Sequence, residues 1–509
     1  MIGRKPWTLS EGFLIGLGLI IVGLVLQLSI GPIDWSLFAW PVNIIALAAL
    51  LLVVVGIFAL RRRIYVCQFL GTYTAAVPAL CYGVVLTVVM GLTRQTPATS
   101  SFGENLWLSD MLMFWPFVLI YTYIALILGL VILKRIVPSR PLSYPPRGMK
   151  KASPRGGLVG ALFHLGLFIA LTTATLGNAD KQRLQLYVTN NPQLANLFTG
   201  AELFHQYEST AIDDTGRRHE LPLAIELKQF IMEMYDDSIT PRRFASEVII
   251  YSEADRHKYA ATIEVNKPVE VDGWKIYQKD YRVTEAGDDC QLSILELVSD
   301  PWLPWVYAGI YLMLAGAVCF MLLSIPWANG WRQARKHPGR ALSIVVLIAA
   351  SFFCVHHFMP ILHSDTLVPA LQSPWFKPHI IAYMLAYTLM ASAALMALFL
   401  LFKKKPLTSH PSPLTSIVCV GLALITVGML FGALWAKEAW GHYWSWDPKE
   451  TWAAATWLGY LVYIHYRRYP RYNPRVALWM LVVCFLLLQM CWWGINYLPS
   501  AQGASVHTY

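Results

Sequence analysis

The chain has 509 residues, of which 56% are hydrophobic and 14% are charged, a composition too apolar for a soluble protein of this size. Its formal net charge of +10 does not gather on one soluble region, which argues against a nucleic-acid-binding protein. Apolar runs of about 20 residues, the length that crosses a bilayer, recur along the chain. The composition therefore predicts a polytopic α-helical membrane protein.

Eleven apolar runs predict membrane-spanning helices. In chain order they are residues 12–30, 41–60, 65–92, 109–133, 157–177, 303–325, 341–356, 378–402, 414–435, 452–466 and 476–494. With the N-terminus in the cytoplasm, the cytoplasmic segments hold 23 Lys and Arg residues and the short external loops hold four. This excess satisfies the positive-inside rule. It predicts that the C-terminus and the long segment 178–301 lie outside the cytoplasm.

Segment 178–301 is predicted to be a small β-rich domain. It carries 22 acidic and 13 basic residues, so it is acidic by nine charges. Four runs rich in β-branched and aromatic residues predict strands, at 246–251, 260–265, 274–277 and 291–297. The pair Asp272-Gly273 predicts a turn. The chain has eight cysteines and no C-x-x-C pair, which gives no support to a thioredoxin-like redox role.

The segment 440–452 places four tryptophans within thirteen residues, between two apolar runs. Tryptophan and tyrosine collect at bilayer interfaces, so a simple aromatic belt is one interpretation. A belt explains a few scattered rings better than it explains the dense string W-G-x-x-W-x-W-D-P-K-E-x-x-W. The alternative is a platform on which a flat apolar ligand stacks, oriented by the polar groups around it.

That string resembles the tryptophan-rich WWD signature of the haem-handling proteins of cytochrome c biogenesis. The wider stretch 434–452, together with 367–373, is most similar to the CcsA (ResC) branch. Three earlier stretches, 265–269, 273–281 and 300–307, resemble the CcsB (ResB) family. Over residues 157–509 the chain therefore resembles a fused CcsB–CcsA cytochrome c haem synthase.

The resemblance implies five regions. They are N-terminal membrane hairpins (1–156), a membrane helix carrying His164 (157–177), an external ResB-like β-rich domain (178–301), linking membrane helices (302–364) and a CcsA-like haem-handling membrane domain (365–509), whose external tryptophan-rich loop spans 434–452.

Two histidines lie inside predicted spans, where an ionisable side chain marks a functional site by default. His164 lies roughly 10 Å from the cytoplasmic start of its helix, at 1.5 Å per residue. His465 lies at the cytoplasmic end of a helix that runs the other way, so both are predicted at the same depth. The alternative for both histidines is a purely structural role. For His465, which lies beside Arg467 and Arg468, that role would be to anchor the helix end at the membrane interface. The resemblance implies that the pair ligates haem iron taken from the cytoplasmic side.

The resemblance also implies an outer pair of iron ligands, His379 and His507, which would hold haem over the tryptophan loop and act in catalysis. His356 and His357 are the rival candidates to His379. His442, inside the motif, is interpreted as structural or as facing the substrate. The predicted haem-contacting residues are Trp435, Trp440, Trp444, Trp446, Asp447 and Trp452. Asp447 precedes a proline, and it is also expected to cap the following helix.

The function implied is that of a holocytochrome c synthase. It would carry haem b across a bacterial inner membrane and attach it through thioether bonds to the C-x-x-C-H motif of apocytochrome c. The insert and the C-terminus would then be periplasmic. Expected partners are apocytochrome c, haem, the bilayer and thiol-reducing proteins, and no nucleic acid. Two alternatives stay open: a haem exporter or chaperone that passes haem on without attaching it, and a b-type electron-transfer protein.

Overall fold

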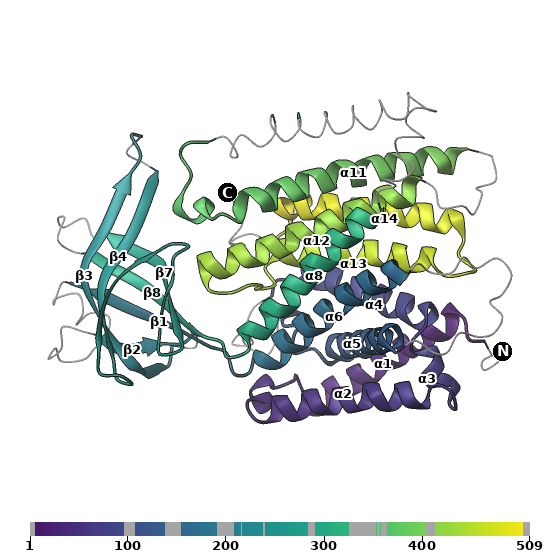
Figure 1. Cartoon of the computed structure of the whole chain (residues 1–509), viewed down its shortest axis with the longest axis horizontal. Helices are drawn as coiled ribbons and strands as arrows, with labels where there is room; N and C mark the ends of the chain where they lie inside the picture. The colour runs from purple at the N-terminus through teal and green to yellow at the C-terminus, as the bar shows by residue number, and fades with distance from the viewer. Residues whose placement is uncertain are drawn as a thin grey trace.

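A computed structural model describes residues 6–95, 107–137, 154–190, 208–214, 216–237, 240–283, 291–324, 353, 357, 364–403 and 413–501. A bundle of long helices carries a β domain at one end (Figure 1). That end is called the β-domain end below. The opposite end, called the basic end, carries Arg61–Arg63, Lys134, Arg135, Lys403, Arg467, Arg468, Arg471 and Arg475.

Nine of the helices in the described residues are long and apolar enough to cross a membrane. They are α1 (Leu9–Ile30), α2 (Val42–Leu60), α4 (Tyr73–Leu92), α5 (Trp115–Ile136), α6 (Pro154–Gly177), α8 (Leu303–Ser324), α11 (Phe376–Phe402), α12 (Pro413–Trp440) and α14 (Pro474–Trp492). The prediction of a polytopic helical membrane protein with a β-rich domain is thus confirmed. The predicted span 341–356, apart from residue 353, lies outside the described residues.

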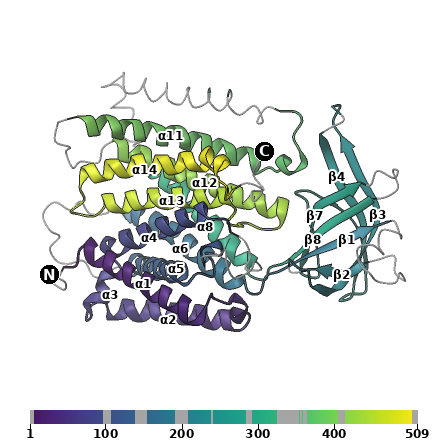
Figure 2. The same ribbon diagram turned by 180° about the vertical axis from the view of Figure 1, so that it is seen from behind.

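The tenth predicted span forms helix α13 (Pro448–Arg467), which is less apolar than the other long helices because it does not need to face lipid. It lies among α4, α12 and α14, as seen from behind in Figure 2. Most of its residues are buried, including Tyr460 and Tyr463. A helix enclosed by its neighbours tolerates polar and aromatic side chains that would be costly against lipid tails.

Two predicted boundaries were wrong. The run 65–92 is not one helix: a short helix α3 (Tyr65–Phe69) ends before Gly71, and α4 then begins at Tyr73. The carbonyl of Gly71 accepts a hydrogen bond from Lys134 Nζ at 2.6 Å, which holds the break against α5. The run 109–133 becomes helical at Trp115, because Pro116 favours the first turn of a helix and residues 110–114 form turns.

The β domain is one antiparallel eight-stranded sheet, in the order β5-β4-β3-β2-β1-β8-β7-β6. The strands are β1 (Gln182–Thr189), β2 (Glu208–Ile212), β3 (Arg218–Met234), β4 (Pro241–Ser252), β5 (Lys258–Glu264), β6 (Val269–Val271), β7 (Trp274–Val283) and β8 (Gln291–Ser299). The sheet curls until β4 faces β7 and β8: the Ser246 hydroxyl donates to Gln278 at 2.7 Å and lies 2.7 Å from the Ser293 hydroxyl. The result is barrel-like, with an apolar core.

The four predicted strands lie within β4, β5, β7 and β8, with the end of one run extending into the turn after β5. Asp272 and Gly273 form the predicted turn, between β6 and β7, with φ angles of +50° and +78°. Two consecutive left-handed residues are what a tight hairpin turn requires.

Asp180 ties the β domain to the bundle at its entry and exit. Its carboxylate accepts hydrogen bonds from Asn43 Nδ2 (2.6 Å), the Trp40 backbone N–H (2.7 Å) and Trp302 Nε1 (2.8 Å). Trp302 directly precedes α8, Trp40 lies two residues before α2 and Asn43 lies in its first turn. The Asp180 carboxylate therefore joins the starts of α2 and α8 to the segment before β1.

Candidate functional site

Two histidines on antiparallel helices meet toward the basic end of the bundle. The imidazole centroids of His164, on α6, and His465, on α13, lie 6.4 Å apart, and the ring planes cross at 74°. A metal–imidazole bond is about 2 Å long, so two rings on opposite faces of one metal ion have centroids about 6 Å apart. The spacing of the pair fits two axial ligands of one iron.

Both imidazoles are held through Nδ1. His164 Nδ1 lies 2.5 Å from the carbonyl of Gly160, and His465 Nδ1 lies 2.8 Å from the carbonyl of Leu461. A carbonyl oxygen only accepts hydrogen bonds, so Nδ1 carries the proton in both rings. In the neutral ring this leaves the lone pair on Nε2, the arrangement found in metal-ligating histidines.

His379 lies in the first turn of α11, at the β-domain end. Its Nδ1 donates to the Gly428 carbonyl of α12 at 2.8 Å, so it has the same tautomer as the other two. The ring centroid lies 4.9 Å from that of Tyr383 and 5.8 Å from that of Trp435. A Cβ on Gly432 would lie 2.8 Å from the imidazole, so only glycine lets α12 approach this closely.

The tryptophans of the motif fall into two groups. Trp435 and Trp452 are only 2% and 3% exposed. The indole N–H of Trp435 donates to the Ala370 carbonyl at 2.8 Å, and that of Trp452 donates to the Gly91 carbonyl at 3.3 Å. These two rings hold the ends of the loop against the segment before α11 and against the end of α4.

Trp440, Trp444 and Trp446 are half-buried and make ring contacts across the loop. The centroids of Trp444 and Trp446 lie 5.7 Å apart at 84°, and Trp446 packs edge-on against Phe117 of α5. Trp446 has a φ of +58°, a strained backbone conformation of the kind that collects at ligand sites. Within the described residues, the buried Trp444 Nε1 has no hydrogen-bond partner.

The polar residues of the motif shape the turn into α13. As predicted, Asp447 is the N-cap: its carboxylate accepts from the Glu450 backbone N–H at 2.7 Å, and Pro448 opens the helix. The Glu450 carboxylate reaches back and accepts from the Ser445 N–H at 2.7 Å. At the start of the motif, Gly441 has a φ of +75°. A Cβ on this glycine would lie 3.0 Å from the side chain of Val298 in β8, so the loop passes close to the β domain here.

His442 is buried beside the β domain and stacks on Trp440, with centroids 6.5 Å apart. Within the described part of the chain its Nδ1 has no hydrogen-bond partner. Burial, together with the charges of Arg183 and Lys181, lowers the pKa of His442 to about 4. The ring is therefore neutral near pH 7.

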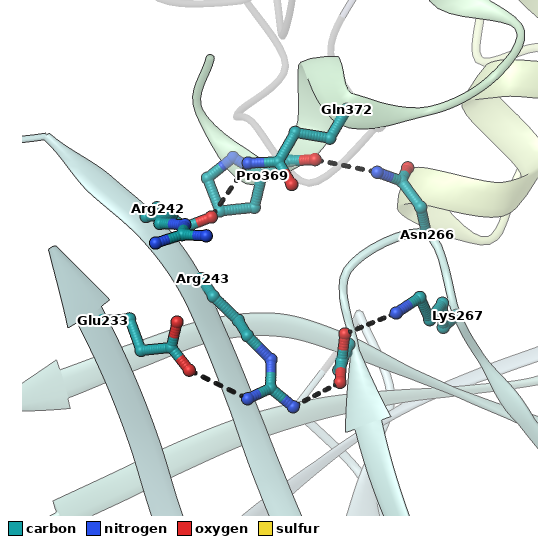
Figure 3. A network of polar contacts seen from close by, with 8 residues as sticks. Glu233, Arg242, Arg243, Asn266, Lys267, Pro369 and Gln372 are labelled. Carbon is teal, nitrogen blue, oxygen red and sulfur yellow. Dashed lines mark hydrogen bonds and ion pairs between the residues drawn. The ribbon is translucent and has the colours of Figure 1, made fainter. Parts of the chain in front are cut away.

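The segment Pro369–Gln372, a 3₁₀ turn (η4), connects the β domain to this outer site (Figure 3). Asn266 Nδ2 donates to the Pro369 carbonyl at 2.8 Å, and Gln372 Nε2 donates to the Arg242 carbonyl at 2.8 Å. The neighbouring carbonyl of Ala370 is the one that holds Trp435. The β domain and the tryptophan loop thus bind the same short turn.

Of the remaining predicted ligands, His507 and the rival His356 lie outside the described residues. The other rival, His357, is exposed and stacks on Phe353. Ala501 is buried in the cluster that contains Trp452, so the chain reaches the β-domain end shortly before His507. His507 follows Ala501 by six residues, and six residues of chain span at most about 20 Å.

The structure adds residues that sequence reasoning missed. Tyr383 lies one turn after His379, and Gly428 and Gly432 receive His379 on the facing helix. Tyr73, at the start of α4, lies with its ring centroid 6.3 Å from that of His465. The G-x-x-x-G spacing on α12 was a usable signal for close helix approach. The Tyr73 contact depends on tertiary packing and had no local signal.

Comparisons with known proteins relate two parts of this chain to known families. The model for the cytochrome C assembly protein family matches residues 304–501, and that for the ResB-like family matches residues 157–294. The cytochrome c biogenesis protein CcsA of Prochlorococcus marinus (strain MIT 9301) is 32% identical over 238 residues, 40% of this chain and 74% of that protein. CcsA of Chlamydomonas reinhardtii is 40% identical over 157 residues, which are 29% of this chain and 43% of that protein. CcsA of Hordeum vulgare is 32% identical over 227 residues, which are 35% of this chain and 69% of that protein.

Fold and comparisons together define a multi-pass membrane protein of cytochrome c biogenesis. The chain belongs to the CcsA family, joined here to a ResB-like region as in a fused CcsB–CcsA protein. Membership of this family supports a role in haem handling during cytochrome c maturation.

The two groups of tryptophans should respond differently to substitution. Trp444→Ala or Trp446→Ala is expected to lower haem occupancy while the folded protein keeps its stability, because these rings are half-buried. Trp435→Ala removes a buried, hydrogen-bonded ring and should destabilise the fold by about 3–5 kcal/mol. Haem content and thermal unfolding in detergent measure the two effects, with the exposed Trp479 of α14 as the control. Equal haem content in Trp444→Ala and Trp479→Ala would show that Trp444 is only a membrane anchor.

Proposed function

We propose that this protein is a cytochrome c haem synthase that takes haem b at the basic end of the bundle, moves it to the β-domain end and attaches it to apocytochrome c. The observation that carries the proposal is the pair His164 and His465, whose ring centroids lie 6.4 Å apart with both Nδ1 atoms fixed on carbonyls. Neutral imidazoles arranged in this way are suited to binding haem iron axially.

The outer site is supported by a third imidazole fixed in the same manner. His379 stands beside the tryptophan loop, where half-buried indoles offer apolar faces and the buried Trp444 Nε1 lacks a partner within the described residues. A bound molecule with an apolar face and an acceptor group would satisfy that donor. We assign His507 as the second outer ligand, on the resemblance and on the place where the described chain ends.

The reaction we propose is the addition of a thiol across a vinyl group of haem. The S–H bond breaks, a C–S bond forms at one vinyl carbon, and the hydrogen goes to the other carbon, so nothing leaves. Both thiols come from the C-x-x-C-H motif of the acceptor. The protein's part is to hold vinyl and thiol in near-attack geometry, which is worth up to about 7–11 kcal/mol of the barrier. His379 and His507 would hold the iron until the acceptor's histidine replaces one of them.

The β domain is the proposed docking site for apocytochrome c. It is bound to the same turn, Pro369–Gln372, that holds Trp435, so a substrate on this domain would lie next to the outer site. Thiol-reducing partners would keep the acceptor's cysteines reduced. We place the protein in a bacterial inner membrane with the basic end in the cytoplasm, in keeping with the positive-inside rule.

The purified protein is expected to carry haem b with a six-coordinate, bis-histidine absorption spectrum. The reason is that each proposed site has two histidines assigned as axial ligands of the haem iron. Absorption and pyridine haemochrome spectra of protein made under haem-replete conditions measure this. A folded but colourless preparation would refute the haem sites and with them the proposed function.

A further inference from the structure

A cleft lies between helices α11 and α14 at the basic end of the bundle. The two helices pack against each other and run in opposite directions (Figure 2). The cleft has a volume of about 260 Å³ and is lined by Leu398, Leu401, Phe402, Arg475 and Trp479. Phe402 is the last residue of α11 and Arg475 is the second residue of α14. The cleft therefore lies where two membrane spans end.

Most of the cleft wall is apolar. On α11, Leu398, Leu401 and Phe402 stand three and four positions apart, a spacing that places them on one face of the helix. On α14, Trp479 follows Arg475 by four positions and shares its face. Phe402 is 85% exposed and Trp479 is 56% exposed. Because exposed apolar side chains on membrane-spanning helices face lipid, acyl chains are the molecules next to this wall.

Arg475 places a positive charge at the end of this apolar wall. Its backbone N–H donates to Asn473 Oδ1 at 2.9 Å, but its exposed guanidinium makes no hydrogen bond or ion pair to any residue that the structure describes. Helices α11 and α14 contain no Asp or Glu. The adjoining segments 403–413 and 467–475 hold seven Lys and Arg residues and no acidic residue. The charge is therefore available to an anion from outside the chain.

We propose that this cleft binds an anionic phospholipid, with the phosphate on Arg475 and part of an acyl chain against Leu398, Leu401 and Trp479. Basic pockets between transmembrane helices bind the headgroups of anionic lipids. A guanidinium forms paired hydrogen bonds with phosphate oxygens, and the dipole of α14 favours negative charge at its N-terminus. A tryptophan at the end of a span suits the interface, because its ring is apolar and its N–H is polar. The site is independent of haem.

Native mass spectrometry of the whole protein, purified in detergent and titrated with lipid, measures this binding. Phosphatidylglycerol is compared with phosphatidylcholine of the same acyl chains and with glycerol 3-phosphate, which has the phosphate and no chain. Arg475→Gln removes the charge, and Arg62→Gln, at another exposed arginine of the basic end, is its control. Leu398→Trp fills the cleft and keeps the charge. Its control is Leu52→Trp on α2, where the leucine is also exposed to lipid.

We expect the wild-type protein to bind one phosphatidylglycerol more tightly than phosphatidylcholine. Arg475→Gln should weaken that binding about fivefold, equivalent to about 1 kcal/mol, and Leu398→Trp should remove the preference. Both controls should bind like the wild type. Equal binding of the two lipids by the wild type would contradict an anionic site.

A loss of binding in Arg475→Gln without a loss in Leu398→Trp would show a general surface charge and would refute the cleft. If glycerol 3-phosphate displaces the lipid at an equal concentration, the ligand is a soluble phosphate and the proposal is wrong. Arg475 is exposed, so its substitution is expected to leave the fold intact and keeps the test available if Leu398→Trp does not fold.

Discussion

Replacing His164 or His465 with glycine is expected to deplete the purified protein of haem at least about tenfold, since losing even an outer-shell partner of a metal ligand costs 10–100-fold in affinity. Loading at the inner site comes first in the proposed sequence, so its failure should empty the outer site as well. Imidazole added to the culture should restore part of the haem, because it fits the vacated ligand position. Pyridine haemochrome analysis of purified protein measures both effects.

Glycine also weakens a helix by about 1 kcal/mol, and this cost needs its own control. Ala161→Gly, on α6 beside His164, carries the same backbone change and leaves the imidazole in place. It should retain wild-type haem content. A normal synthase yield from His164→Gly without imidazole would reduce His164 to a packing residue and remove the inner site from the mechanism.

Replacing His379 with glycine should act differently. Haem still enters at the inner pair, so the protein is expected to keep part of its haem while the axial ligation of the outer site changes. Attachment to the acceptor should fall at least about 100-fold, because positioning of the reacting groups is worth several kcal/mol. His507→Gly should have the same two effects. Absorption spectra report the ligation, and haem staining of the acceptor on a denaturing gel reports attachment.

Ala382→Gly is the matched control for His379→Gly, because Ala382 lies one turn further along α11 and faces α8 and α12. It should leave attachment intact. If His379→Gly attaches haem as well as Ala382→Gly does, the outer ligand lies elsewhere, with His356 and His357 as the next candidates.

Much of the architecture follows from the sequence because bilayer-spanning helices are specified by local apolar composition. The break at Gly71 escaped prediction, because the apolar run continues through it and only the contact with Lys134 reveals it. Half of the strands were missed. In β1 the buried positions Leu184, Leu186 and Val188 alternate with polar ones, a period-two signal that was available in the sequence.

The candidate site was predictable in its residue types and not in its contacts. Opposite helix directions predicted that His164 and His465 share a depth, and in the structure the two rings meet. The motif alone did not distinguish Trp435, which is buried and fixed on Ala370, from Trp444, whose buried N–H lacks a partner in the described chain. That difference depends on the segment before α11, which is distant from the motif in sequence.

A bacterial host that lacks its own attachment system can show whether this chain attaches haem as well as carrying it. The protein is co-expressed there with an apocytochrome c, and covalent haem in the acceptor is stained on a denaturing gel. We expect a stained acceptor band that disappears when either cysteine of the C-x-x-C-H motif is replaced. Purified protein that carries haem while the reduced acceptor remains unstained would contradict the synthase and identify a haem exporter or chaperone instead.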